Sequence, residues 1–476
     1  MACERKKLTA EIIKDIGIIH RFDPPHKYEI GNTGVTIDLR YQAWPSAMVD
    51  ENGVIYAFIS GRQKHIDPFG QTLLYKSYDN GDTWSDPIIV NDTPMDDRDV
   101  GVAYLGNGKI LITYFRISAW GLIGKDQSFV NVEGREIRGS RPDTKNDQGY
   151  HTDGYASWQN PAFSSPEQVQ AVFDYWKTMT YEELDGGTWC LTSEDYGETW
   201  SKPMPTPCST PHGPIVRKDG SLLYVGRGRV AGVGGDGIYA FTSNDFGRSW
   251  QFVSKIHENT CLTYCEPHVV ELDSGRLVVA MRVQIQDQVI DGKLYQVIGF
   301  DPTGVALWVN KDDGRKYYHI TESRVPVETE DRAPHTGYRL YTCFSDDNGQ
   351  TWSQPMVVTA TNPEGLESVS GQPYGTPPHL LKLDGGEIVM TYATRNFDIG
   401  ERAIVSYDDG KTWDKEIILC NKPYDTEPGS PYNYKHGDIG YPATVKTADG
   451  NLVSVYYQAY TDDRYCSYLY TKWSLK

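Results

Sequence analysis

Short runs of alternating apolar and polar residues, separated by turn-forming pairs, recur along almost the whole chain. One unit occurs six times: a polar or proline-containing start, an apolar strand, an Asp-Gly, Asn-Gly or Ser-Gly turn and a second apolar strand. This pattern predicts antiparallel β-hairpins, because alternation at period two is typical of strands and these pairs favour tight turns. The six copies start at Trp44, Asp99, Thr210, Glu266, Thr376 and Tyr441.

A second repeat, Ser-x-Asp-x-Gly-x-Thr/Ser-Trp, follows each of the first five hairpins. Its aspartate can accept hydrogen bonds from nearby backbone amides, its glycine permits a left-handed φ, and its tryptophan can pack beneath the turn. We therefore expect these Asp boxes to stabilise hairpins rather than to catalyse a reaction. The copies run from Ser77 to Trp84, Ser193 to Trp200, Ser243 to Trp250, Ser345 to Trp352 and Ser406 to Trp413.

Two hairpins per unit predict a four-stranded antiparallel blade. Six such units predict an all-β fold, a six-bladed β-propeller that is a single domain over residues 1–476. The sixth unit has no Asp box. We expect its outer strand to come from the N-terminal segment at residues 18–34, which would close the ring of blades. The abundance of Tyr, Trp and Gly agrees with a fold of half-buried strands and tight turns.

Two insertions, at about residues 118–187 and 301–334, break the even spacing of the repeats. The first contains a helix signal, with Ser165 as N-cap, Pro166 at the first helical position and Gln168 completing a capping box. We expect a small helical insertion in the second blade, which packs as a lid element near a binding mouth. The second insertion is compatible with an extended hairpin or with a partner-contact surface.

The formal net charge of −18 disfavours nucleic acid and anionic membranes as partners, because the field of the whole molecule repels them. A small anionic substrate therefore requires a local arginine cluster. The N-terminal residues lack an apolar signal core, and no window of the chain approaches the length of a membrane span. We expect a cytoplasmic protein.

Eight cysteines at irregular positions favour reduced thiols over a disulfide framework. Cys261, Cys265 and His268 have the spacing of half a zinc site, but no second pair of ligands has matching spacing. The glycine-rich segment at residues 232–237 resembles a phosphate loop, but a strand and an Asp box follow it instead of a helix. We therefore expect neither a metal nor an organic cofactor.

Two rings of residues should face one end of the hairpins, because the start of the first strand and the end of the second lie at the same sheet end. Arginine suits a carboxylate ligand, since its planar fork gives two parallel hydrogen bonds. Each arginine could instead pair with an acid of a neighbouring blade. The second strands end at Arg62, Arg116, Arg227, Arg282, Arg395 and Gln458, and the first strands begin with Trp44, Asp99, His212, Glu266, His379 and Tyr441.

Three segments resemble those of the sialidase superfamily of exo-acting glycoside hydrolases. They are Glu266-Pro-His-Val-Val-Glu-Leu through Arg282, Gly440-Tyr441-Pro-Ala-Thr-Val, and Arg62-x4-Asp67. The resemblance implies a retaining hydrolase of a terminal carboxylated sugar, such as sialic acid, in a glycan. It implies Tyr441 as nucleophile, Glu266 as its base and Asp67 as acid/base. A phenol fits this chemistry, because a carboxylate nucleophile would be repelled by the substrate carboxylate.

The chain departs from the family's pattern at the start of the first blade, where Tyr41 to Pro45 lack the usual arginine. Arg40, Arg98 and Arg116 are possible substitutes from nearby. The third arginine of the family's triad corresponds to either Arg395 or Arg402. The expected substrate-binding set is Arg62, Arg282, Arg395, Arg402, Arg116, Asp99, His212 and Trp44.

Two other functions are compatible with the same sequence. One is a propeller hydrolase or lyase acting on another sugar, such as a uronic acid, with His212, His268 or His379 taking part. The other is a non-catalytic propeller that binds a glycan or a protein, since a fold alone does not establish a function.

Overall fold

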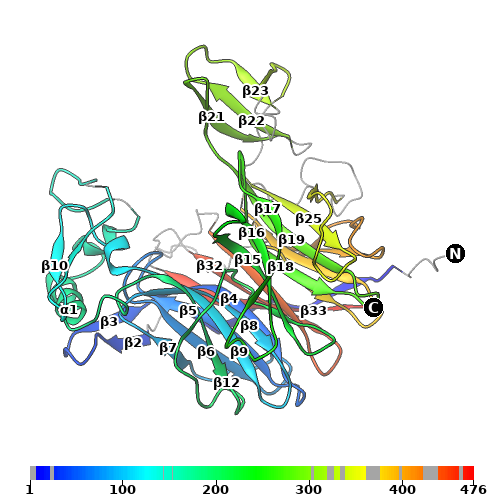
Figure 1. Ribbon diagram of the computed structural model, residues 1–476. Helices are drawn as coiled ribbons and strands as arrows, with labels where there is room; N and C mark the ends of the chain where they lie inside the picture. The colour runs from blue at the N-terminus through cyan, green and yellow to red at the C-terminus, as the bar shows by residue number, and fades with distance from the viewer. Residues whose placement is uncertain are drawn as a thin grey trace, which may run out of the picture.

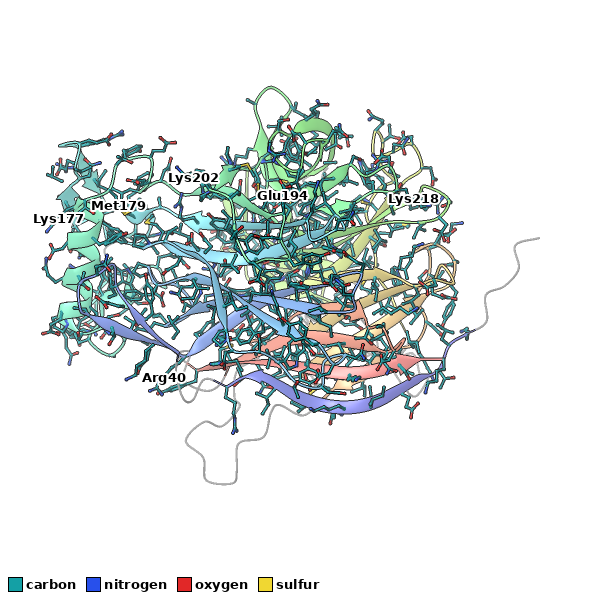
Figure 2. All side chains as sticks on the ribbon, turned by 90° about the horizontal axis from the view of Figure 1, so that it is seen from below. Arg40, Lys177, Met179, Glu194, Lys202 and Lys218 are labelled. Carbon is teal, nitrogen blue, oxygen red and sulfur yellow. The ribbon has the colours of Figure 1, made fainter. Side chains whose placement is uncertain are left out.

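Antiparallel β-sheet makes up nearly all of the regular structure, accompanied by one α-helix among the described residues (Figure 1). Within those residues the main sheets contain six groups of four strands. The sheets follow one another in chain order around the molecule (Figure 2). The computed structural model describes residues 7–21, 26–142, 144–152, 154–301, 305–318, 326–332, 338–360, 376–395, 399–421, 438–459 and 465–476.

Four of the groups are separate four-stranded sheets. The second group along the chain contains β8 (Asp96–Tyr104), β9 (Ile110–Ile117), β12 (Gly187–Ser193) and β13 (Met204–Pro205). The third contains β14 (Ile215–Val216), β15 (Leu222–Val230), β16 (Gly234–Ser243) and β17 (Gln251–Glu258). The fourth contains β18 (Leu262–Glu271), β19 (Leu277–Ile285), β25 (Tyr338–Ser345) and β26 (Met356–Val357). The fifth contains β27 (His379–Lys382), β28 (Ile388–Thr394), β29 (Gly400–Ser406) and β30 (Ile417–Cys420).

The first and last groups share one eight-stranded sheet, because Cys466 of the last group pairs with Tyr41 of the first. Contacts between neighbouring groups also run round the molecule and return from the sixth to the first. The first group contains β4 (Tyr41–Val49), β5 (Ile55–Arg62), β6 (Gln71–Ser77) and β7 (Ile88–Asp92). The last contains β31 (Ile439–Lys446), β32 (Leu452–Ala459), β33 (Cys466–Leu475) and β1 (Ala10–His20).

The outer strand of the last group comes from the N-terminal part of the chain, but not from the range that the sequence predicted. Strand β1 pairs with β33 from Ala10 to His20, so it lies mostly before residues 18–34. The later residues instead form a separate hairpin of β2 (His26–Glu29) and β3 (Thr36–Leu39). The turn at residues 31–34, where two glycines adopt positive φ, reverses the chain and makes this hairpin.

The Asp boxes form the turns that the sequence predicted, each beginning at the last residue of a third strand. In the first box, Asp79 Oδ1 accepts hydrogen bonds from Ser77 Oγ at 2.8 Å and Thr83 N at 2.9 Å. Gly81 has φ of 86° and donates to Ser77 Oγ at 2.9 Å. The other four boxes repeat these contacts. The boxes are therefore structural, as expected.

The first insertion has its own apolar core beside the first two groups of strands. Helix α1 (Pro166–Lys177) begins with the predicted capping box, and it packs Trp176 against Trp158 and Phe129. The hairpin β2–β3 joins the same core, and Figure 1 shows it next to α1. The other elements of this insertion are η1 (Ala119–Gly121), β10 (Ser128–Val130), β11 (Glu136–Arg138) and η2 (Ser157–Gln159).

The second insertion begins earlier than the sequence predicted and is larger than one hairpin. It forms a five-stranded sheet between β19 and β25, which projects away from the rest of the molecule in Figure 1. The predicted range of 301–334 misses its first two strands, β20 and β21, which precede residue 301. The strands are β20 (Gln288–Ile290), β21 (Lys293–Phe300), β22 (Ala306–Asn310), β23 (Lys316–Tyr318) and β24 (Val327–Glu328).

Gly101 of β8 illustrates how closely the inner strands approach one another. A Cβ atom at this position would lie 2.2 Å from Gly213 N and 2.5 Å from Gly213 Cα. Both are backbone atoms, which cannot rotate away as a side chain can. The approach of the second and third groups therefore requires glycine at Gly101.

We predict that Gly101→Ala destabilises the protein by about 1–3 kcal/mol, the usual cost of overpacking. Gly235→Ala is the matched control, because its Cβ would make an ordinary contact of 3.5 Å with the end of the Glu258 side chain. Thermal unfolding followed by circular dichroism measures both variants. Equal melting temperatures for the two variants would contradict this account of the packing.

Candidate active site

Four inner strands carry the same backbone irregularity close to their start. Trp44, Asp99, Glu266 and Tyr441 all adopt left-handed backbone conformations, with φ of 58°, 57°, 51° and 52°. Each strand shifts register there, as a β-bulge does. A non-glycine residue in this region costs about 1–2 kcal/mol, so the surrounding sheet must hold all four bulges in place. The bulges turn these four side chains out of the regular alternation.

The central contact of the site joins Tyr441 on β31 to Glu266 on β18. The Tyr441 phenol donates a hydrogen bond to Glu266 Oε1, and Arg282 Nη1 donates to Glu266 Oε2 at 2.8 Å. Tyr441 is only 6% exposed, and burial followed by the charge of Glu266 raises the pKa of this phenol well above its usual value. The phenol is therefore neutral at rest and already paired with a proton acceptor.

Three arginines surround Tyr441. The Arg395 guanidinium lies 5.9 Å from the centre of the Tyr441 ring, and Arg282 is linked to the phenol through Glu266. Arg98 stacks at 4.1 Å on the ring of Trp44, which belongs to the same apolar cluster as Tyr441. Arg98 also interacts electrostatically with Tyr441.

Arg62 does not join this cluster as a free cation. Its side chain is fully buried, where Nη1 pairs with Asp96 Oδ1 and Nη2 donates to the carbonyl oxygen of Asp97. The other oxygen of Asp96 lies 3.4 Å from Arg98 Nη1. Asp96 therefore holds both arginines, and Arg98 is the one of the two with some exposure, 8%.

Asp67 lies in the loop between β5 and β6 and is completely buried. Its Oδ2 accepts from Lys64 N at 2.6 Å, and its Oδ1 accepts from Phe69 N at 2.8 Å. Burial raises the pKa of Asp67 to about 6, against the opposing effect of Arg62. Both oxygens are therefore engaged with the backbone of their own loop.

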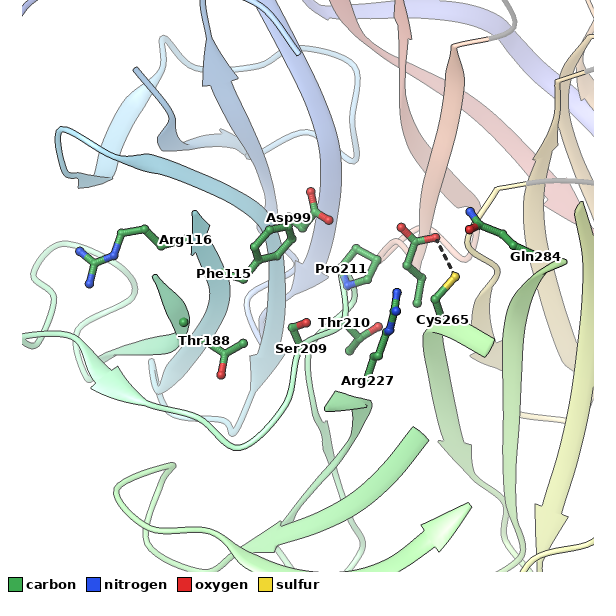
Figure 3. A pocket seen from close by; sticks show the side chains of 12 residues that line it. Asp99, Phe115, Arg116, Thr188, Ser209, Thr210, Pro211, Arg227, Cys265 and Gln284 are labelled. Carbon is green, nitrogen blue, oxygen red and sulfur yellow. Dashed lines mark hydrogen bonds between the residues drawn. The ribbon is translucent and has the colours of Figure 1, made fainter. Parts of the chain in front are cut away.

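Asp99 instead lines a cavity of about 380 Å³ next to Glu266. Figure 3 shows Arg116 and Phe115 towards one end of this cavity and Gln284 at the other, with Thr210 and Pro211 between them. Burial raises the pKa of Asp99 to about 6; Arg98 opposes this rise and Glu266 adds to it. The remaining lining residues are Gly187, Thr188, Ser209, Arg227 and Cys265.

The two candidates for the third arginine lie in different surroundings. Arg395 Nη2 donates to the Tyr457 hydroxyl at 2.8 Å and lies 3.3 Å from Asp438 Oδ1, beside Tyr441. Arg402 is buried within the fifth group, where it donates to two backbone carbonyls and pairs with Glu416 at 3.7 Å. The structure thus brings Arg395, and not Arg402, to Tyr441.

Arg116 lies at the far end of the cavity, stacked at 4.8 Å on Trp189. Arg227 also lines the cavity, and it forms a two-bonded pair with Asp236 at 2.8 and 2.7 Å. Neither arginine is part of the cluster around Tyr441. Of the arginines that the sequence predicted to form a ring, Arg282 and Arg395 therefore lie around Tyr441, whereas Arg116 and Arg227 line the cavity.

His212, His268 and His379 pack against one another where the inner strands converge. Their ring centres lie 4.4–5.2 Å apart, and all three are buried. His268 Nδ1 accepts from Leu380 N at 2.9 Å, and His379 Nδ1 from Thr444 N at 3.3 Å. Burial lowers the pKa of all three, that of His379 to about 3. The structure thus places His212 in a neutral packing cluster and not along the cavity.

Sequence reasoning missed a second hydrogen-bond network beside Arg395. Asp438 accepts hydrogen bonds from Tyr41 at 2.8 Å and from Tyr457 at 2.6 Å. His65 Nδ1 lies 2.9 Å from the same Tyr41 hydroxyl. Although burial opposes it, His65 and Arg395 hold the pKa of Asp438 well below its usual range. Asp438 stands three residues before Tyr441 in the sequence, and this proximity was the one signal that could have identified Asp438 as a site residue.

Among the described residues, no group of three or more His, Cys, Asp or Glu side chains could hold a metal ion. In the same part of the chain, the seven cysteines are buried and unbridged. No helix there has the length and apolar character needed to cross a membrane.

Comparisons with known proteins bear on the fold and on the family. Residues 221–454 match the family model described as a BNR repeat-like domain. A comparison with curated proteins gives no match. The chain therefore resembles the BNR-repeat superfamily, but as a divergent relative.

Solved structures share the fold at low sequence identity. A protein of unknown function from Dyadobacter fermentans is 15% identical, with 98% of this chain and 99% of that chain covered and a TM-score of 0.57. A Penicillium chrysogenum alpha-L-arabinanase is 14% identical, with 97% and 98% covered and a TM-score of 0.50. A Trypanosoma rangeli sialidase mutant with trans-sialidase activity is 14% identical over 98% of this chain, with a TM-score of 0.50. This chain spans 60% of the length of that sialidase.

The histidine cluster generates a prediction about acid stability. Since the folded pKa of His379 is about 3 and an unfolded histidine titrates near 6.5, the unfolded chain binds the extra proton between these values. Stability must therefore fall as the pH falls below 6.5. The share of His379 in this loss is about 2 kcal/mol between pH 7 and pH 5.

We predict that His379→Gln, which keeps an acceptor for Thr444 N, loses less stability than the wild type over this pH interval. Denaturant unfolding at pH 7 and pH 5 gives both differences, and comparing the variant with the wild type cancels the effects of the buried carboxyls. An equal loss in both proteins would mean that His379 is charged in the folded state.

Proposed function

We propose that this chain, a divergent relative of the BNR-repeat propellers that include sialidases, is a retaining exo-glycosidase. Its proposed substrate is a glycan that ends in a carboxylated sugar, either sialic acid or a related acidic sugar. The observation that carries the proposal is the contact of a buried tyrosine with a glutamate that is itself held by an arginine. The similarity to solved structures supports the fold, and the geometry of these side chains supports the chemistry.

In the proposed reaction Tyr441 is the nucleophile. A tyrosine with a raised pKa needs a base at neutral pH, and Glu266 Oε1 already accepts its hydrogen bond. Arg282 orients Glu266 by donating a hydrogen bond to its other oxygen. A neutral phenol approaches an anomeric carbon that bears a carboxylate without the charge repulsion that an Asp or Glu nucleophile would meet.

The substrate carboxylate is bound by Arg98, Arg282 and Arg395 in this proposal. All three lie around Tyr441, so a carboxylate bound there places the adjacent anomeric carbon next to the phenol. Arg98 is one of the substitutes that the sequence offered for the missing arginine, whereas Arg62 is fully buried, pairs with Asp96 and stacks on Trp44. The missing arginine of the first group is thus replaced from the second.

The proposed scaffold is one six-bladed propeller formed by the whole chain, residues 1–476. The six groups of four strands are then its blades, and the contacts that return from the sixth group to the first support a closed ring. All proposed steps use side chains of this chain, so no cofactor enters the reaction.

We predict that the purified protein releases the fluorophore from an aryl glycoside of a carboxylated sugar, and that Tyr441→Phe lowers kcat at least about 1000-fold. Tyr456→Phe is the matched control, because Tyr456 is buried in the same group and its hydroxyl contacts Thr471. The measurement uses aryl α-sialosides, aryl uronides and an uncharged aryl glycoside. Failure of the wild type on every substrate would contradict the proposed function.

We further predict that Arg395→Lys raises KM for the carboxylated substrate about 10–100-fold, because one lysine cannot replace a planar fork. Arg402→Lys should leave KM within about twofold of the wild-type value, since Arg402 lies away from Tyr441. Steady-state kinetics of the two variants show whether Arg395 or Arg402 binds the substrate carboxylate. The opposite pattern would assign the carboxylate ligand to Arg402.

A further inference from the structure

Asp99 is a cavity-lining carboxyl with an unsatisfied oxygen beside the proposed nucleophile. It is 7% exposed, and its Oδ1 has no hydrogen-bond partner among the described residues. The same oxygen lies 3.7 Å from Arg98 Nε. A buried polar atom without a partner costs free energy, so its position indicates a ligand that is bound during function.

The backbone fixes Asp99 in this position independently of its charge. It is one of the four bulge residues, and its amide donates to Ser60 Oγ at 3.1 Å. Glu266 is the bulge residue across the cavity, and both carboxyls line the same 380 Å³. The two groups also act on the charge of each other, and Asp99 acts on that of Tyr441. Asp99 thus lines the cavity and lies close enough to Tyr441 for the two groups to interact electrostatically.

Asp67 has neither an oxygen without a hydrogen-bond partner nor a position along the cavity. Its two oxygens accept backbone hydrogen bonds from Lys64 and Phe69, it is fully buried, and it does not line this cavity. A carboxyl engaged in this way stabilises the turn of its loop. To reach a substrate it would have to give up both hydrogen bonds.

We propose that Asp99, and not Asp67, is the catalytic carboxyl that transfers the proton at the glycosidic oxygen, with the departing group held in the adjacent cavity. The inference rests on the proposed glycosidase function and names a further residue for it. The lining of the cavity suits a second sugar: Phe115 offers an apolar face, whereas Thr188, Ser209 and Gln284 offer hydrogen-bonding groups.

The two steps balance in protons and bonds. In the first, Tyr441 Oη bonds to the anomeric carbon and gives its proton to Glu266, while the glycosidic C–O bond breaks and its oxygen takes the proton of Asp99. In the second, water bonds to the same carbon and gives a proton to Asp99. As the water bonds, the bond to Tyr441 breaks, and the phenolate recovers its proton from Glu266.

The environment of Asp99 supports both steps. Because burial raises its pKa to about 6, a useful fraction is protonated near neutral pH, and the ionised form is also accessible. The first step needs the protonated form, so kcat/KM should fall as the pH rises through about 6. In a variant without this carboxyl, the decrease of kcat/KM as the pH rises through about 6 should be absent.

The test compares Asp99→Asn with Asp67→Asn on two glycosides of the same sugar, one with an activated nitrophenol and one with an alkyl alcohol as leaving group. For Asp99→Asn we expect a loss at least about 100-fold larger on the alkyl glycoside, which needs proton donation. Sodium azide should accelerate this variant on the activated substrate and give the glycosyl azide. For Asp67→Asn we expect the same fractional loss on both substrates and no azide product.

Asp99→Glu, which keeps a carboxyl, should restore the decrease of kcat/KM with rising pH and part of the activity on the alkyl glycoside. The assignment would be overturned if Asp67→Asn, instead of Asp99→Asn, lost more activity on the alkyl glycoside and was accelerated by azide. Equal fractional losses of Asp99→Asn on the two glycosides would also overturn it. If the wild type hydrolyses neither glycoside, the proposed function itself fails, and the role of Asp99 fails with it. Circular dichroism of each variant separates these results from a loss of fold.

Discussion

The hydrogen bond between Tyr441 and Glu266 joins residues 175 positions apart, and it depends on the arrangement of the whole sheet system. Tyr441 lies on β31 of the last group and Glu266 on β18 of the fourth. Strand β27 of the fifth group contacts both β18 and β31, and the last group also pairs with the first through β33 and β4. Fold and candidate chemistry therefore depend on the same long-range contacts between groups.

Within that frame, repeated bulges convert a structural repeat into a site. The same left-handed residue and register shift recur in four inner strands, but the side chains differ: a tryptophan, an aspartate, a glutamate and a tyrosine. The strain of each bulge is sustained by a sheet that pairs regularly on both sides of it. Because the backbone is the same in each copy, substitution at one position changes the chemistry without changing the fold.

Electrostatics in the site are local and oppose the charge of the molecule. The formal net charge is −18, yet three arginines surround Tyr441. They remain in place because acids hold them: Asp96 shares its two oxygens between Arg62 and Arg98, Asp438 lies beside Arg395, and Glu266 accepts from Arg282. These pairs leave the guanidinium groups oriented, and a substrate carboxylate would add a further anion to a cluster that is already arranged.

The sequence by itself determined the β-hairpins, the five Asp boxes and the capping box of α1, because turn residues and period-two alternation act over a few neighbouring positions. It also indicated that Tyr441, Glu266 and Arg282 lie at the same end of their hairpins. Tertiary structure decided how each arginine is held: Asp96 pairs with both Arg62 and Arg98, but Arg62 is fully buried whereas Arg98 keeps some exposure. It likewise decided that β1 rather than residues 18–34 covers β33, and that Asp99 rather than Asp67 lines the cavity. Burial and pairing of a charge depend on groups far away in the chain, and no local pattern of residues carries that information.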